Sequence, residues 1–423
     1  MLRASVLALS LSWPAGLFAQ ARPERPPSPN DLRNLFSAGY ILEDRNGDDV
    51  IDFLNVRIVL PSAPDEAEVT AAANLAARLG YETSALDLGM ANTGADGAGR
   101  FDVPVILIGA GSSARSGDGG TLVSDPTERL APGQGAITFV PQDTQYTQGG
   151  LRISGDDATG LLAAADYASG RYPNVWGLEG DSYEDVADKL AGFLEERDVQ
   201  IDALTLDVIV VDAAQLGVRR LEATVRVPDS ESFDRALEAL DPENSREADS
   251  ASVTTPVPDQ EGEERDEDQL ELGDLEFADL HRIDLHVMGP GSTRRFRLLP
   301  DEPRKTRAGR TWSPRDVSDF TLSDLYSIKG LYHDTNQDLV PDQVDGYVSL
   351  HGSDAPGGAV DLAARIGLES AGIRLPLVRP AGQDDYPEAS GFPILYGLGH
   401  YQTERLREEG RLHTASGDRG EGF

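Results

Sequence analysis

The sequence predicts an α/β fold that contains two related units. Segments with the alternation or the β-branched content of strands are interleaved with segments that have the apolar periodicity of helices. This order is typical of a layered α/β domain with right-handed crossovers. An acidic motif also occurs twice, and each copy is followed by the same order of predicted elements. Duplication of one α/β unit accounts for these observations.

The first unit is predicted over residues 31–198. Its helix 65–79 carries an apolar stripe that ends at Gly80. Its segment 103–108 is continuously apolar, as expected for a strand buried on both faces of a parallel sheet. The other predicted elements are strands at 53–60, 84–88, 136–140 and 151–154 and helices at 158–169 and 183–197.

A middle region over residues 199–315 has a different pattern and is predicted to be α+β. The predicted elements are strands at 204–211, 219–227, 281–287 and 294–299 and a helix at 232–240. Residues 244–274 are rich in Glu, Asp, Ser, Thr and Pro and offer little apolar surface to bury. We therefore predict a disordered acidic segment there.

The second unit is predicted over residues 316–423. Its segment 361–370 repeats 74–83 at an offset of 287 residues, whereas the acidic motifs are 290 residues apart. The predicted elements are a strand at 346–350, a helix at 358–366 and strands at 373–377 and 392–396. The later strands and the helix 158–169 of the first unit have no counterpart here, so we interpret the second unit as truncated.

The N-terminus predicts a signal peptide over residues 1–21. Arg3 precedes a short apolar segment, and Ala19-Gln20-Ala21 matches an A-x-A cleavage site. A membrane anchor is the alternative, but the apolar segment is much shorter than the ~20 residues of a spanning helix. Residues 22–30 are rich in proline and predict a linker. We expect export to the periplasm or the extracellular space.

The charge balance excludes several classes of partner. The chain has 73 acidic and 37 basic residues, a formal charge of -36 and no cysteine. Such a surface repels nucleic acids and anionic membranes and favours cations. Adaptation to high salt and an arginine-rich codon usage both remain open as causes. Without cysteine the chain has no disulfide bonds, so bound calcium is a plausible source of stability.

The acidic motif D-x-N-x-D-x-x-x-D predicts two calcium loops. Calcium takes about six to eight oxygen ligands, and the side chains at motif positions 1, 3, 5 and 9 with the carbonyl at position 7 supply such oxygens. The predicted ligands are Asp44, Asn46, Asp48, Val50 and Asp52 in the first copy and Asp334, Asn336, Asp338, Val340 and Asp342 in the second, with Asp345 at position 12. The glycine that an EF-hand has at position 6 is replaced by Asp49 and Leu339. A hydrated acidic turn without metal is the alternative.

No catalytic signature accompanies these loops. Gly109 to Ala114 reads G-x-G-x-x-A, but the surrounding pattern favours a tight glycine turn after a strand over a dinucleotide site. The six histidines form no H-E-x-x-H motif, and no G-x-S-x-G motif is present. We predict no catalytic residue and no organic cofactor, and we favour a protein that is not an enzyme.

Two resemblances extend this interpretation. The acidic loops resemble the short calcium repeats of thrombospondin type 3 and dockerin modules, which implies structural calcium. Val56 to Pro61, Pro104 to Gly109, Pro132 to Ile137 and Leu151 to Ala165 occur in an order that resembles the N-terminal accessory α/β domain of β-hexosaminidases and α-glucuronidases. The order is also similar to the flavodoxin-like domains of periplasmic polysaccharide-export subunits. The resemblance implies two flavodoxin-like units and a non-catalytic role.

Two hypotheses for the function remain at this point. The first is an exported, calcium-stabilised, non-catalytic protein that interacts with a carbohydrate or a component of the cell envelope. The second is an N-terminal fragment of a larger secreted hydrolase, a glycosidase or a peptidase, whose catalytic domain lies beyond Phe423.

Overall fold

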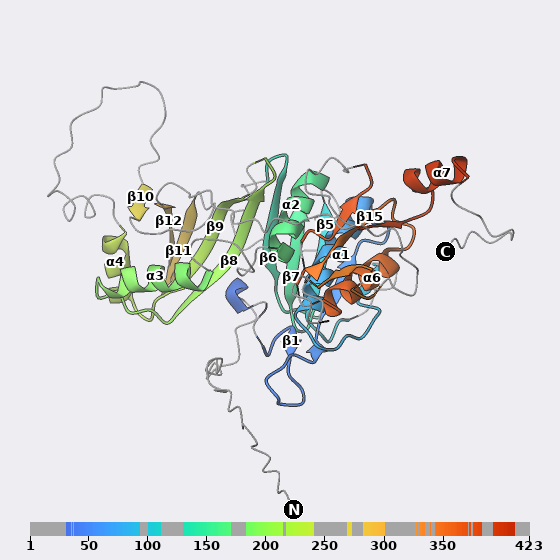
Figure 1. Cartoon of the computed structure of the whole chain (residues 1–423). Helices are drawn as coiled ribbons and strands as arrows, with labels where there is room; N and C mark the ends of the chain where they lie inside the picture. The colour runs from blue at the N-terminus through green and yellow to red at the C-terminus, as the bar shows by residue number, and fades with distance from the viewer. Residues whose placement is uncertain are drawn as a thin grey trace, which may run out of the picture.

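The computed structural model has a mixed α/β fold, which confirms the predicted class (Figure 1). It describes residues 31–34, 36, 38–93, 100–110, 130–170, 183–214, 217–240, 269–272, 282–300, 326–328, 330–334, 339, 343–370, 372–373, 375–382 and 392–410. The predicted signal peptide and linker lie outside these residues.

A large mixed sheet forms the core of the first unit. Parallel pairing joins strands β3 (Arg57–Leu60), β4 (Ala91–Thr93), β5 (Val105–Ala110) and β7 (Gly150–Gly155), and β6 (Gln134–Val140) runs antiparallel to β7. Val105 and Ile106 of β5 are buried, as predicted from the continuous apolar segment. A short 3-10 helix (Leu32–Asn34) precedes these strands.

The middle region continues this sheet. Strand β6 pairs on its other side with β8 in an antiparallel manner, and the ten strands lie in the order β10-β12-β11-β9-β8-β6-β7-β5-β3-β4. The added strands are β8 (Ala203–Asp212), β9 (Gly217–Arg226), β10 (Gln269–Leu272), β11 (Ile283–Gly289) and β12 (Ser292–Pro300). Helix α3 (Tyr183–Glu195) packs on β8, and α4 (Ser230–Ala239) packs on β11. The strands of this α+β region therefore extend the sheet of the first unit.

The second unit has a parallel three-stranded sheet of its own. Its order is β16 (Val378–Pro380), β15 (Gly346–Leu350) and β17 (Phe392–Tyr396), with helix α6 (Pro356–Leu368) between β15 and β16 and helix α7 (Tyr401–Glu408) after β17. Ile58 pairs with Ala91 in the first sheet, and the repeat-equivalent Val348 pairs with Val378 in the second. Equivalent residues of the two units therefore pair with each other's equivalents, as the duplication in the sequence predicts.

Helices α1 and α6 join the two units. Helix α1 (Glu66–Tyr81) begins with a capping box, in which Asp65 accepts from the backbone N–H of Glu68 and the Glu68 side chain accepts from that of Asp65. It lies against α6 on one side and against α2 (Ala158–Gly170) on the other. Figure 1 shows α6 next to α1.

The contact between α1 and α6 has approximate twofold symmetry. A Cβ atom added at Gly80 would lie 2.0 Å from the carbonyl oxygen of Ala364, and one added at Gly367 would lie 2.0 Å from that of Ala77. Gly367 is the repeat equivalent of Gly80, and Ala364 that of Ala77. Each helix therefore uses the same glycine to admit the backbone of its partner.

Hydrogen bonds across the units follow the same symmetry. The buried amide of Asn74 bonds both the N–H and the carbonyl of Val378, at 2.7 and 2.9 Å, where β16 begins. Its repeat equivalent, Asp361, accepts from the N–H groups of Gly89 and Met90, just before β4. Each helix thus fixes the first residues of a strand in the other unit.

Several predicted boundaries differ from the structure. Residues 84–88 and the described part of 373–377 are not strands, because the short parallel strands form a few residues later, at β4 and β16. Residues 53–60 divide into β2 (Phe53–Leu54) and β3. Residues 269–272 of the predicted disordered segment form β10, and the rest of 244–274 lies outside the described residues. Among the described residues, no helix is long and apolar enough to cross a membrane.

Candidate functional site

A two-stranded hairpin holds each acidic loop. Strand β1 (Leu42–Glu43) pairs antiparallel with β2 around the first loop, and β13 (Tyr332–His333) pairs with β14 (Gln343–Val344) around the second. Leu42 and Leu54 are buried on one side of the first loop, and Tyr332 and Val344 are buried on one side of the second. Apolar anchors therefore lie at the base of both hairpins, and the first of them carries an exposed polar loop.

The first loop turns its predicted ligands towards its own backbone. The Asp44 carboxylate accepts from the N–H groups of Gly47 and Asp49 at 2.6 and 2.9 Å. Asn46 Oδ1 accepts from Asp48 N–H at 2.9 Å. Asp48 Oδ1 and Asp52 Oδ1 accept from the N–H groups of Val50 and Arg45 at 3.0 and 2.8 Å. All four predicted side-chain ligands therefore take part in closing the loop.

The two loops share a backbone conformation at position 6. Asp49 has a φ of 66° and Leu339 a φ of 71°, the left-handed region that leucine seldom adopts. In each loop the N–H of this residue donates to the aspartate at position 1, from Asp49 to Asp44 at 2.9 Å and from Leu339 to Asp334 at 2.8 Å. The glycine of an EF-hand is replaced, but the conformation that favours glycine is kept.

The other predicted ligands have different surroundings. Asn336, Asp338, Val340 and Asp342 lie outside the described residues. Asp345 directly follows β14 and is buried, with its backbone N–H donating to Leu331 at 2.6 Å. In the part of the chain that the structure describes, no group of three or more His, Cys, Asp or Glu side chains lies close enough to hold a metal ion. Asn46 and Val50 are not among these residue types, because they would bind a metal ion through an amide oxygen and a backbone carbonyl oxygen.

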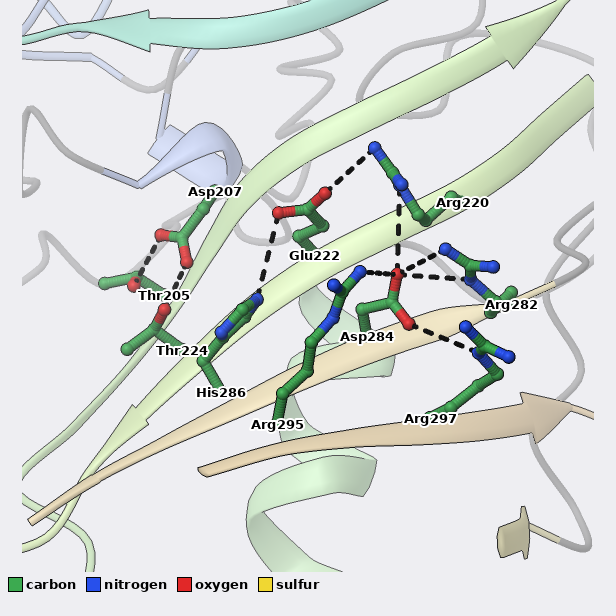
Figure 2. Close-up of polar contacts among 10 residues, drawn as sticks. All are labelled: Thr205, Asp207, Arg220, Glu222, Thr224, Arg282, Asp284, His286, Arg295 and Arg297. Atoms are coloured by element: carbon green, nitrogen blue, oxygen red, sulfur yellow. Dashed lines mark hydrogen bonds and ion pairs between the residues drawn. The ribbon is translucent and has the colours of Figure 1, made fainter. Parts of the chain in front are cut away.

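A charged cluster on the middle strands was not found from the sequence. Figure 2 shows side chains of β9 and β12, and Arg282 just before β11, gathered around the carboxylate of Asp284 in β11. Its Oδ2 lies 2.8 Å from Arg282 and 2.9 Å from Arg295, and 3.8 Å from Arg220; its Oδ1 lies 3.9 Å from Arg297. The alternation of side chains along neighbouring strands places all of these groups on one face of the sheet.

Burial gives this cluster its electrostatic character. Asp284 and Glu222 are almost completely buried, and Arg220 lies 3.1 Å from Glu222. A buried carboxylate costs several kcal/mol unless cations and hydrogen bonds compensate it, which the guanidinium groups do here. His286 Nε2 lies 3.9 Å from Glu222, and burial, followed by the charge of Arg295, lowers the pKa of His286. The neutral imidazole adds no net charge at neutral pH, and the cluster is suited to holding strands together.

Asp207 of β8 lies next to this cluster (Figure 2). Its carboxylate accepts from the hydroxyl groups of Thr205 and Thr224 at 2.8 and 2.5 Å. Burial raises the pKa of Asp207 to about 6, although both hydroxyl groups oppose the rise. A raised carboxyl pKa is typical of a general acid, but the Asp207 carboxylate bonds Thr205 of its own strand and Thr224 of β9, which indicates a structural role.

The other motifs are dispersed. Gly109 and Ala110 end β5, and the rest of the G-x-G-x-x-A segment lies outside the described residues. His333 belongs to β13, His286 to the charged cluster, and His351 and His400 to the second unit, whereas His281 and His413 lie outside the described part. No protein family and no curated protein matches this chain.

Proposed function

We propose that this is an exported, calcium-stabilised, non-catalytic protein that interacts with a carbohydrate or a component of the cell envelope. The observation that carries the calcium part is the equivalence of the two acidic loops. Both are closed by the same hydrogen bond to the first aspartate, and both have the same left-handed residue at position 6.

Energetic reasoning supports a cation in the first loop. Asp44, Asp48 and Asp52 place three carboxylates within nine residues of an exposed loop, beside Asp49. Like charges at this spacing repel one another, and a divalent cation removes the repulsion while taking the oxygen ligands it prefers. The left-handed backbone conformation costs about 1–2 kcal/mol at each of Asp49 and Leu339. A cation that binds the loop in this conformation compensates that cost.

Thermal unfolding of the full chain tests the calcium part. A ligand of the native state stabilises by about 2.7 kcal/mol at a hundredfold excess over its Kd, so melting should rise with calcium and fall with chelator. Asp48→Ala and Asp338→Ala should each remove part of this rise. Asp49→Asn is the matched control, because it also removes one charge from the loop but keeps a residue type that tolerates positive φ.

The result separates calcium binding from a general effect of charge. If Asp49→Asn loses as much of the calcium response as Asp48→Ala, screening of the acidic loop explains the data without a site. Equal melting with calcium and with chelator would refute the calcium part outright.

The carbohydrate part is supported by the resemblance of the first unit to accessory domains of glycosidases and to polysaccharide-export subunits. We expect the protein to bind immobilised saccharides without releasing sugar from them. A glycan array followed by analysis of reducing ends measures both properties. Release of reducing sugar by the pure protein would contradict a non-catalytic role.

A further inference from the structure

The carboxyl ends of β15 and β17 mark a reversal in the second sheet. From β15 the chain crosses to β16 on one side and then returns to β17 on the other. In open α/β sheets, ligands bind at the carboxyl edge beside such a reversal. His351 follows β15 at this edge, and Gly397 to His400 follow β17. Helix α7 extends from here at the outer end of the molecule (Figure 1).

His400 is fixed at the base of this edge. It is fully buried, its Nδ1 accepts from the backbone N–H of Gln402 at 3.2 Å, and its Nε2 lies 3.0 Å from Ser349 Oγ. A backbone N–H only donates, so Nδ1 is the acceptor and Nε2 carries the proton of the neutral ring. Nε2 therefore donates to Ser349 and does not act on it as a base. The His400–Ser349 pair therefore has a structural role and is not a nucleophilic dyad.

The buried His400 ring positions an exposed aromatic ring. Tyr401 stacks on His400 with ring centroids 5.1 Å apart and an angle of 19° between the planes, yet 42% of Tyr401 is exposed. Its hydroxyl accepts from the Gln402 side chain at 3.1 Å. Because one face of the ring lies against a buried partner, the exposed surface is the opposite face and the edge. Leu398, three residues earlier in the chain, is also exposed, to 67%.

Polar groups adjoin His400, on which Tyr401 stacks, at the end of β15. The His351 ring meets His400 edge-on, with centroids 5.9 Å apart, and its Nδ1 lies 3.9 Å from Glu66 Oε2. Glu66 belongs to the first turn of α1 and also accepts from Gly352 N–H at 2.7 Å. The side chains of His351 and Glu66 are 42% and 32% exposed. Glu66 of the first unit thus contacts the residues that follow β15 in the second unit.

We propose that Tyr401, with His351 and Glu66, forms a binding platform for a neutral saccharide, an inference that rests on the proposed carbohydrate interaction and gives it a location. A sugar ring has an apolar C–H face that packs on a preorganised aromatic ring and hydroxyl groups that bond a carboxylate and an imidazole. A neutral sugar fits best, because a chain with a formal charge of -36 repels acidic polysaccharides at long range.

Binding measurements on the full chain test the platform. The probes are a glycan array that carries neutral and acidic oligosaccharides, followed by calorimetric titration with the neutral oligosaccharide that binds best. Tyr401→Ala should weaken its binding by about tenfold or more, and Tyr401→Phe should largely retain it. Glu66→Gln and His351→Ala should each weaken it by a smaller factor. Tyr326→Ala is the control, because Tyr326 is 41% exposed and its ring contacts Tyr332 and Arg365.

The outcomes separate this platform from the proposed function. If wild type binds a neutral saccharide and Tyr401→Ala binds it equally, only the platform is refuted. If wild type binds no saccharide, the carbohydrate part of the proposed function is refuted together with the platform, while the calcium part keeps its own test. Binding to acidic oligosaccharides alone would also overturn the platform. Melting of each variant confirms that loss of binding is not loss of folding.

Discussion

The two units are alike where they touch and differ at their outer strands. Strand β5 of the first unit pairs on both sides, and Val105 N–H donates to Gly149 at 3.0 Å beside β7. The strand pairing makes Pro393 of β17 the equivalent of Val105, since Ile106 opposite Ile58 corresponds to Ile394 opposite Val348. Proline has no N–H to offer to a further strand. Within the described residues, β17 pairs only with β15.

This difference teaches which part of the repeat is under structural constraint. The glycines, the Asn74 and Asp361 contacts and the strand registers occur in both units because each serves the contact between them. Among the described residues the outer side is extended only in the first unit, whose sheet continues through β7 and β6 into the middle strands. The following experiments break or sharpen this comparison.

The largest effect is expected where the first sheet is extended. Asp284→Ala leaves the surrounding guanidinium groups without their buried carboxylate, and breaking a buried ion network costs about 3–5 kcal/mol. Chemical denaturation measures the loss. Asp234→Ala, which removes a charge from the exposed face of α4, should have almost no effect. A similar small effect for Asp284→Ala would show that the cluster does not hold the middle strands.

The helix contact gives the next effect. Gly80→Ala and Gly367→Ala each place a Cβ against a backbone carbonyl, and overpacking of this kind costs about 1–3 kcal/mol. The two losses should be similar, because the contacts are equivalent by symmetry. Gly357→Ala in the same helix as Gly367 has nothing within 4 Å and should be neutral or slightly stabilising. Unequal losses at Gly80 and Gly367 would show that the symmetry is only geometric.

The buried amide distinguishes the units chemically. Asn74→Asp replaces a donor to the Val378 carbonyl with a second acceptor, which should cost about 1–3 kcal/mol above neutral pH. Asp361→Asn should cost much less, because Asp361 only accepts and its amide oxygen can still do so. Urea denaturation of both variants at one pH provides the comparison. Equal losses would mean that the donor role of Asn74 is unimportant.

The sequence predicted elements better than it predicted their contacts. The apolar stripe of helix 65–79 and the acidic repeat are local patterns, and both elements are found where expected. The charged cluster joins residues from Arg220 to Arg297, each of which reads as an ordinary surface charge in its own segment. Only the order of strands brings them to one face. Likewise, nothing local to His351 and Tyr401 indicates that β15 and β17 end side by side.

The protonation state of Asp166, near the contact between the units, is expected to have a smaller effect on stability. Burial raises the pKa of Asp166 in α2 to about 7, and the nearby charge of Arg379 opposes this rise only in part. The folded state then binds more protons than the unfolded state between about pH 4 and pH 7, so this group lowers stability as pH rises through that range. Asp166→Asn should therefore melt higher than wild type at pH 8, by a few degrees, and the gain should vanish near pH 4. A gain that does not depend on pH would point to packing instead.

The smallest effect on stability is expected at the outer edge of β17. Pro393→Val restores a backbone N–H at the position where Val105 donates in the first unit. The monomer should be nearly as stable as wild type, because an edge position loses no internal hydrogen bond. Self-association should increase instead, because Pro393 no longer prevents a strand of another molecule from pairing with β17. Sedimentation over a range of concentrations measures this change, with Pro356→Ala in α6 as a control for loss of a proline. A Pro393→Val variant that stays monomeric at every concentration would show that the edge is protected by something other than its proline.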